Sequence, residues 1–97
     1  MKLLGIVSFK SKRLARFYRS GFVRGLRFAN QACVESVLSR LDDAYSLEQF
    51  MRPQDRLHRL RGNLNGFWSV RISANYRIIF RWVDGEGAHD LDLLDCH

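Results

Sequence analysis

The chain has 97 residues, which suffices for one folded domain with a modest core and is too short for two. Its 46% apolar content excludes an intrinsically disordered protein, and no apolar run reaches the roughly 18 residues of a membrane-spanning helix. A net charge of +6 favours a nucleic-acid partner. Only three of the sixteen basic residues are lysines, so guanidinium groups, which suit bidentate phosphate contacts, dominate.

The amino-terminal half carries mainly helical signals. Residues 6–10 are predicted to form a short opening strand, and Ser11 is a suitable N-cap for a helix that ends at Gly21. A longer helix is predicted over residues 27–45. Its apolar side chains step by three and four along one buried stripe, formed by Val34, Val37, Leu38, Leu41 and Ala44.

A short helical turn and the lone proline close this half of the chain. Ser46 and Gln49 have the spacing of a capping box, and Pro53 is expected to end the helical region. The two cysteines, Cys33 and Cys96, match neither a metal-ligand spacing nor a disulfide framework. The first residues lack the apolar length and cleavage site of a signal peptide. We therefore expect a protein of the reducing cytoplasm with no membrane association.

Beyond Pro53 the hydrophobic period changes from 3.6 to 2, which indicates strands. Residues 67–73 and 76–83 alternate between apolar and polar side chains, and residues 73–75 form a tight hairpin between them. A turn at residues 84–87 leads into a last strand around Leu91 and Leu93. The pattern predicts an α+β protein whose helices cover one face of a mostly antiparallel, four- to five-stranded sheet.

The uncovered face of this sheet is expected to carry Arg71 and at least one of Arg77 and Arg81. They fit two interpretations. In the first they are solvated charges, or they pair with Asp90 and Asp92 on the neighbouring strand. In the second they hold the phosphates of RNA. The residues alone leave both interpretations open.

The side chains best suited to acid–base chemistry lie in two polar clusters. Residues 57–62 contain His58 and Arg61, and the carboxyl-terminal cluster contains Asp95 and His97. We expect the last strand to bring the second cluster close to the first, which would suit general acid–base cleavage of a phosphodiester. The alternative interpretation of the second cluster is a solvated tail.

Other kinds of site have little support. His89 follows a turn and is expected to be solvated. A zinc site built from the histidines and Cys96 lacks the close paired spacing of zinc ligands. The P-loop, dinucleotide-binding and zincin motifs are absent from the sequence. We expect neither a metal nor a cofactor.

Five blocks of sequence, taken together and in order, resemble the HigB toxins of bacterial type II toxin–antitoxin systems, within the RelE/ParE superfamily. They occupy residues 6–10 (IVSFK), 57–62 (LHRLRG), 66–70 (GFWSV), 75–80 (NYRIIF) and 95–97 (DCH). The resemblance covers essentially the whole chain. It implies a RelE-like fold and a single toxin domain over residues 1–97.

The resemblance also implies an activity. Such a toxin is a ribosome-dependent endoribonuclease that cuts mRNA in the decoding site, without a metal, by attack of the ribose 2′-OH. By position, the implied catalytic residues are His58, Arg61, Asp95 and His97. The implied RNA-binding residues are Arg71, Arg77, Arg81 and Cys96.

Two residues depart from the family's pattern. Arg61 stands where lysine is usual, and it keeps the positive charge but is no proton donor at neutral pH. Cys96 stands where tyrosine is usual, and a thiol cannot stack on a base as a tyrosine ring does. The resemblance leaves open whether activity is weaker in consequence.

The implied partners are a helix-turn-helix antitoxin of the HigA kind, the small ribosomal subunit with its mRNA, and operator DNA contacted only through the antitoxin. Two alternative functions are a ParE-like toxin that inhibits a DNA topoisomerase without cutting RNA, and a basic RNA-binding protein. The histidine pair favours the nuclease, since a pure binder needs charge but no titratable pair.

Overall fold

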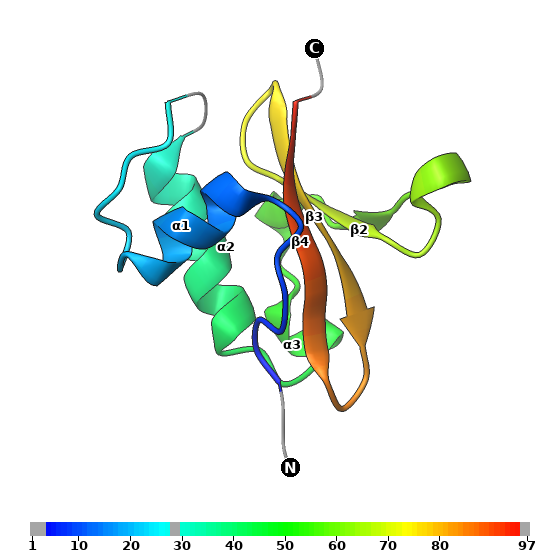
Figure 1. Cartoon of the computed structure of the whole chain (residues 1–97). Helices are drawn as coiled ribbons and strands as arrows, with labels where there is room; N and C mark the ends of the chain where they lie inside the picture. The colour runs from blue at the N-terminus through cyan, green and yellow to red at the C-terminus, as the bar shows by residue number, and fades with distance from the viewer. Residues whose placement is uncertain (1–3, 28–29, 96–97) are drawn as a thin grey trace.

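A four-stranded antiparallel sheet forms one layer of the computed structural model, which describes residues 4–27 and 30–95 (Figure 1). Its strands lie in chain order: β1 (His58–Arg59), β2 (Trp68–Arg71), β3 (Tyr76–Val83) and β4 (Gly87–Asp95). The alternation of residues 76–83 therefore predicted β3 with its observed bounds.

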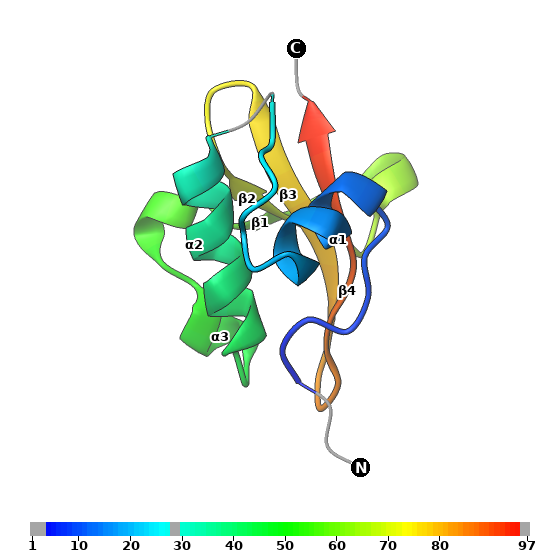
Figure 2. The same cartoon turned by 60° about the vertical axis from the view of Figure 1, so that its left-hand side comes forward.

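The second layer consists of α1 (Lys12–Arg19) and α2 (Gln31–Asp42), which cover one face of the sheet (Figures 1 and 2). The short helix α3 (Leu47–Phe50) and two 3₁₀ turns, η1 (Pro53–Asp55) and η2 (Gly62–Leu64), complete the described elements. The α+β prediction, with helices on one face of an antiparallel sheet, is confirmed. None of the described helices has the length and apolar character needed to cross a lipid bilayer.

Side-chain caps decide where the helices begin. The Ser11 hydroxyl accepts a hydrogen bond from the Leu14 amide at 3.1 Å, as predicted. The second helix is shorter than the predicted range 27–45. It begins after Asn30, whose side chain accepts from the Cys33 amide, and it ends at Asp42. Apolar periodicity overestimated its length, because a buried residue beyond the last helical turn, Ala44, continues the same stripe.

The segment around Ser46 and Pro53 also differs in detail. The Ser46 hydroxyl caps α3, but the Gln49 side chain accepts from the Tyr45 amide, so the predicted reciprocal capping box is not formed. Pro53 begins a 3₁₀ turn. A proline suits the first position of a helical turn because its missing N–H would have no partner there.

The prediction of an opening strand over residues 6–10 is wrong. This segment makes only two isolated parallel bridges to β4, Ile6 with Ala88 and Phe9 with Leu91. Between them Asp90 adopts a left-handed conformation (φ 57°), and its amide donates to the Ser8 hydroxyl at 2.9 Å. Asp90 interrupts the regular ladder as a β-bulge does: β4 passes it with a register shift against β3, and its pairing with residues 6–9 is limited to two bridges.

One hydrophobic core fills the space between the layers. Each large apolar side chain in it contributes about 1.5–3 kcal/mol through burial. The helices and the sheet both contribute, through Leu14, Phe17, Val34, Leu38, Leu41, Val70, Ile78, Phe80 and Leu91. The core therefore fixes one face of the sheet against the helices and leaves the other face for a different role.

Candidate functional site: the open face of the sheet

Strand register identifies the side chains on the face away from the helices. Val70, Ile78 and Leu93 are register partners and belong to or pack against the core, so the neighbouring rows point the other way. We call the surface formed by these rows the open face. It consists of His58, Ser69, Ile79 and Asp92 in one row, Arg71, Arg77 and Leu94 in a second, and Arg81 and His89 in a third. Ser69 and Ile79 face this side but are themselves buried.

His58 lies on the edge strand β1 and is exposed. Its Nδ1 lies 3.0 Å from the carbonyl oxygen of Arg56. A carbonyl only accepts, so Nδ1 must carry the proton in this contact. In the neutral imidazole Nε2 is then an unprotonated acceptor. The arrangement prepares His58 to take a proton from a bound group.

The left-handed conformation of Arg56 sets the direction of its carbonyl group. Arg56 ends η1 with φ 49° and ψ 44°, a conformation that is uncommon outside glycine and needs support from its surroundings. The support comes from Asp55, which is 3% exposed. Its carboxylate accepts hydrogen bonds from the Arg40 guanidinium at 2.9 and 2.5 Å and from the Arg52 amide at 3.1 Å.

Arg40 connects this turn to α2. Besides its two-pronged contact with Asp55, its Nη2 donates to the Phe50 carbonyl at 2.7 Å, and the guanidinium lies 4.5 Å from the Phe50 ring centroid. Removing one partner of a largely buried ion pair typically costs 3–5 kcal/mol, because the other charge stays buried. The position of His58 therefore depends on a strong, non-local anchor.

Arg71 and Arg77 lie directly opposite each other on the open face. Like charges at such a position destabilise a sheet. Among the described residues, the recorded ion pairs include neither of them. Two arginine side chains thus leave neighbouring positions of one face, and no carboxylate of the described residues is paired with either, which favours a bound anion.

Arg81 differs. Its Nε donates to the Asp90 carboxylate at 2.8 Å, so the cross-strand pairing considered for these arginines is present here. The two side chains are 43% and 41% exposed, and exposed pairs contribute about 1 kcal/mol or less. Arg81 is therefore partly neutralised, and Arg71 and Arg77 are the stronger candidates for phosphate binding.

The two arginines of the first polar cluster, Arg59 and Arg61, are exposed. Arg61 follows β1 and precedes η2, three positions from His58. Arg59 points to the other face, where its guanidinium lies 5.6 Å from the Trp68 ring centroid. Ser69, the register partner of His58, has a buried hydroxyl with no hydrogen-bond partner among the described residues. Polar groups of this kind are uncommon and often belong to functional sites.

The structure does not bring Asp95 beside His58, contrary to our expectation. Asp95 ends β4, at the opposite edge of the sheet, and three strand spacings of about 4.8 Å separate the edges. Its register partner is Tyr76, which places it on the helix side by alternation. Cys96 and His97, the other predicted residues of this cluster, lie outside the described residues.

His89 does not have the solvated environment expected from the sequence. His89 is part of β4, its side chain is 17% exposed, and its Nε2 lies 2.9 Å from Glu86 Oε1, so it is not a solvated turn residue. Cys33 is only partly buried, and that burial raises the pKa of its thiol. Within residues 4–27 and 30–95, no three histidine, cysteine or acidic side chains form a cluster that could hold a metal ion.

Sequence reasoning missed the anchor of His58. The Arg40–Asp55 contact joins residues fifteen positions apart, and the carbonyl of Arg56 is a backbone group. Neither leaves a spacing in the sequence. The one available signal was an aspartate just after Pro53, since the Asp55 side chain accepts from the Arg52 amide across that turn.

Known proteins are similar to this chain in sequence and in fold. Residues 7–97 match the model of the family described as "RelE-like toxin of type II toxin-antitoxin system HigB". The chain is 32% identical to "Endoribonuclease HigB" of Proteus vulgaris over 95% of this chain and 99% of that one. It is 35% identical to "Toxin HigB-1" of Vibrio cholerae serotype O1 over 81% of this chain and 85% of that one.

A solved structure supports the fold. The chain superimposes on a YoeB/ParE toxin from Agrobacterium tumefaciens with a TM-score of 0.54 and 20% identity, over 97% of each chain. At that identity the likeness concerns architecture alone. The family match over nearly the whole sequence shows that the chain belongs to the HigB-like family of RelE-like toxins from type II toxin–antitoxin systems.

Proposed function

We propose that this toxin is a ribosome-dependent endoribonuclease that cuts mRNA by attack of a ribose 2′-OH on the adjacent phosphate. The relative from Proteus vulgaris, which is similar over nearly the whole chain, is named an endoribonuclease. The observation that carries the proposal is the pair Arg71 and Arg77, which lie opposite each other on the same face as His58 and pair with no carboxylate of residues 4–27 and 30–95.

The arginine pair supplies the electrostatic part of the chemistry. A phosphodiester placed between Arg71 and Arg77 relieves the repulsion between the two guanidinium groups and gains charge-assisted hydrogen bonds. These interactions strengthen as negative charge develops on the non-bridging oxygens in the transition state. Arg61 adds a third guanidinium, which stabilises charge but donates no proton.

His58 supplies the base. RNA brings its own nucleophile, so the protein must take the 2′-OH proton, and Nε2 of His58 is the acceptor left available by the Nδ1 contact with Arg56. The 2′-oxygen then bonds to phosphorus and the bond from phosphorus to the 5′-oxygen breaks. The products are a 2′,3′-cyclic phosphate and a 5′-hydroxyl.

A second group must return a proton to the departing 5′-oxygen. We assign this role to His97, with Asp95 as the residue that orients it, on the sequence resemblance alone. Cys96 is proposed to line the base-binding side of the site, with weaker stacking than an aromatic ring would give. The proposed reaction uses no metal or cofactor.

Membership of a type II toxin family implies an antitoxin. We propose that this partner is a helix-turn-helix protein of the HigA kind, that it docks on the exposed side of α2, and that operator DNA is contacted only through it. The other proposed partners are the small ribosomal subunit and its mRNA, which also place the toxin in the cytoplasm.

Cleavage of mRNA on programmed ribosomes, with the ends mapped, tests the proposal. His58→Ala should slow cleavage by about 10² to 10⁴, the usual contribution of a general base, while the fold is retained, as judged by circular dichroism. Supercoiling by DNA gyrase, assayed in parallel, should be unaffected by wild-type toxin. Intact mRNA together with inhibited supercoiling would replace the nuclease with a topoisomerase inhibitor.

A further inference from the structure

Positive charge gathers on α1, on the opposite layer from the open face. Eight of the sixteen basic residues of the chain precede residue 28, and the first acidic residue is Glu35. Helix α1 and the following loop carry six of the seven described members of this group, which are Lys12, Arg13, Arg16, Arg19, Arg24 and Arg27. The activity proposed for the open face uses none of them.

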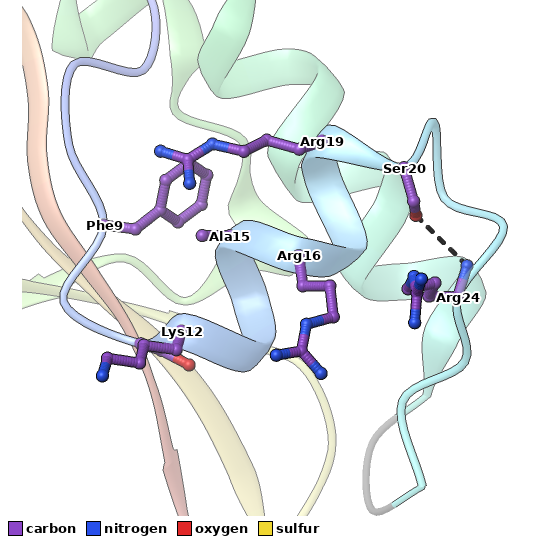
Figure 3. A pocket seen from close by; sticks show the side chains of 8 residues that line it. Phe9, Lys12, Ala15, Arg16, Arg19, Ser20 and Arg24 are labelled. Carbon is purple, nitrogen blue, oxygen red and sulfur yellow. Dashed lines mark hydrogen bonds between the residues drawn. The ribbon is translucent and has the colours of Figure 1, made fainter.

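Two neighbouring cavities are lined by these basic side chains. One of about 540 Å³ lies between α1 and the loop and includes Lys12 and Arg19 in its lining (Figure 3). A second of about 500 Å³ includes Arg13 and Arg27. Both are lined by Arg16 and Arg24, so they adjoin across these side chains. We call the joined space the α1 trough.

Three arginines of the trough are available to a partner. Arg16, Arg19 and Arg24 are exposed, and none of the ion pairs recorded within the described part of the chain involves them. Asp42, at the end of α2, bonds the hydroxyl of Tyr18 on α1 and takes part in none of these ion pairs. Unpaired guanidinium groups along one helix are the electrostatic footprint of phosphate binding.

The lining also limits what the trough can recognise. Its two hydroxyls already serve the backbone: Ser11 accepts from the Leu14 amide, and Ser20 accepts from the Arg24 amide at 3.2 Å (Figure 3). Guanidinium groups are left as the main polar contacts. Contacts of this kind go to phosphates and carry little sequence information.

An acidic protein segment fits the trough less well than a phosphate backbone does. Protein interfaces depend on buried apolar or aromatic anchors. Here the apolar lining residues Ala15, Phe17 and Leu26 are 7%, 2% and 6% exposed. Phe9 is half-buried and packs on Tyr18, with ring centroids 5.4 Å apart. Apart from Gly25, the exposed lining residues are cationic.

From this arrangement we infer that the α1 trough binds the phosphate backbone of structured RNA, independently of sequence, as a second RNA contact on the side of the protein away from the open face. The inference rests on the proposed function only in taking RNA as the nucleic acid. The toxin then holds its substrate strand on the sheet and a separate, base-paired RNA segment on the helical layer.

Fluorescence anisotropy with a short RNA duplex that is not a substrate tests the trough without any cleavage. The triple variant Arg16→Ala, Arg19→Ala, Arg24→Ala lowers the net charge by three. Each lost phosphate contact should reduce the slope of log Kd against log salt by about 0.9, so we expect a reduction of about 2 to 3 and at least tenfold weaker binding at low salt.

A matched control separates local contacts from net charge. The variant Ala32→Glu, Ser36→Glu, Ser39→Glu also lowers the charge by three, at exposed positions of α2 that line neither cavity. It should keep the wild-type slope. Equal losses in both variants, or wild-type binding by the α1 variant, would overturn the inference, as would an α1 variant that keeps RNA binding but no longer binds the antitoxin. A duplex-binding protein without nuclease activity would instead contradict only the proposed function.

Discussion

Arginine does different work in two regions of this toxin. At the turn before β1, Arg40 meets the buried carboxylate of Asp55 and anchors the backbone that orients His58. On the open face, Arg71 and Arg77 lie opposite each other, and no carboxylate in the described part of the chain pairs with either. Whether an arginine is structural or free to bind a ligand therefore depends on the carboxylates around it more than on the residue type.

The paired region should give the largest effect on stability. Asp55→Asn leaves the Arg40 guanidinium without its counter-charge in a partly buried site, so we expect the free energy of unfolding to fall by about 3–5 kcal/mol. Asp90→Asn is the matched control. Its pair with Arg81 is about half exposed, and the loss should be about 1 kcal/mol or less. Urea denaturation midpoints measure both, and equal losses would remove the distinction between the two pairs.

Substitution of Arg71 or Arg77 should affect cleavage strongly and stability little. Arg71→Ala or Arg77→Ala should leave stability unchanged or slightly raised, since a repulsion is removed. Each should lower kcat/KM for mRNA cleavage by about 10- to 100-fold, the value of a lost charge-assisted hydrogen bond. Arg81→Ala should have a smaller effect, because Asp90 already shares its charge. A larger loss for Arg81→Ala than for the other two would contradict this ranking.

The smallest expected effect concerns the contact between the helices. Burial, the hydrogen bond to Asp42 and the charges of Asp42 and Asp43 raise the pKa of Tyr18 to about 12. A raised folded-state pKa stabilises the protein fully below the unfolded value near 10, and this contribution is lost as pH rises through the folded value. Wild-type stability should therefore fall between about pH 10 and 12.

Tyr18→Phe isolates that contribution. It should flatten the loss of stability in this pH window relative to wild type, at a cost of about 1 kcal/mol at neutral pH for the missing hydrogen bond. Thermal midpoints between pH 7 and 11 measure the difference. Parallel pH profiles for the two proteins would mean that Tyr18 does not cause the loss of stability in this pH range.

Local signals in the sequence predicted the elements well where the deciding interaction is local. Ser11 caps α1 through a residue three positions away, and the alternation of residues 76–83 reflects one strand between two neighbours. The opening strand was wrong because its ladder depends on the left-handed Asp90, more than eighty residues distant. The end of α2 was misplaced because burial continues past the helix at Ala44.

The candidate site shows the same limit. Alternation on β2 and β3 was enough to place Arg71 and Arg77 on one face. It could not reveal that Arg81 is neutralised by Asp90, or that Asp95 and His58 occupy opposite edges of the sheet. Those facts depend on a β-bulge between Ile79 and Arg81 and on strand order, which are properties of the assembled sheet.

The central claim is that RNA is cut by its own 2′-OH on the open face. The most direct measurement uses programmed ribosomes carrying an mRNA with one 2′-deoxynucleotide immediately 5′ of the mapped scissile phosphate. The account predicts that cleavage at that phosphate disappears, whereas the all-ribose message is cut there to a 2′,3′-cyclic phosphate. Unchanged cleavage of the deoxy-substituted message would contradict it, because water or a protein group would then be the nucleophile.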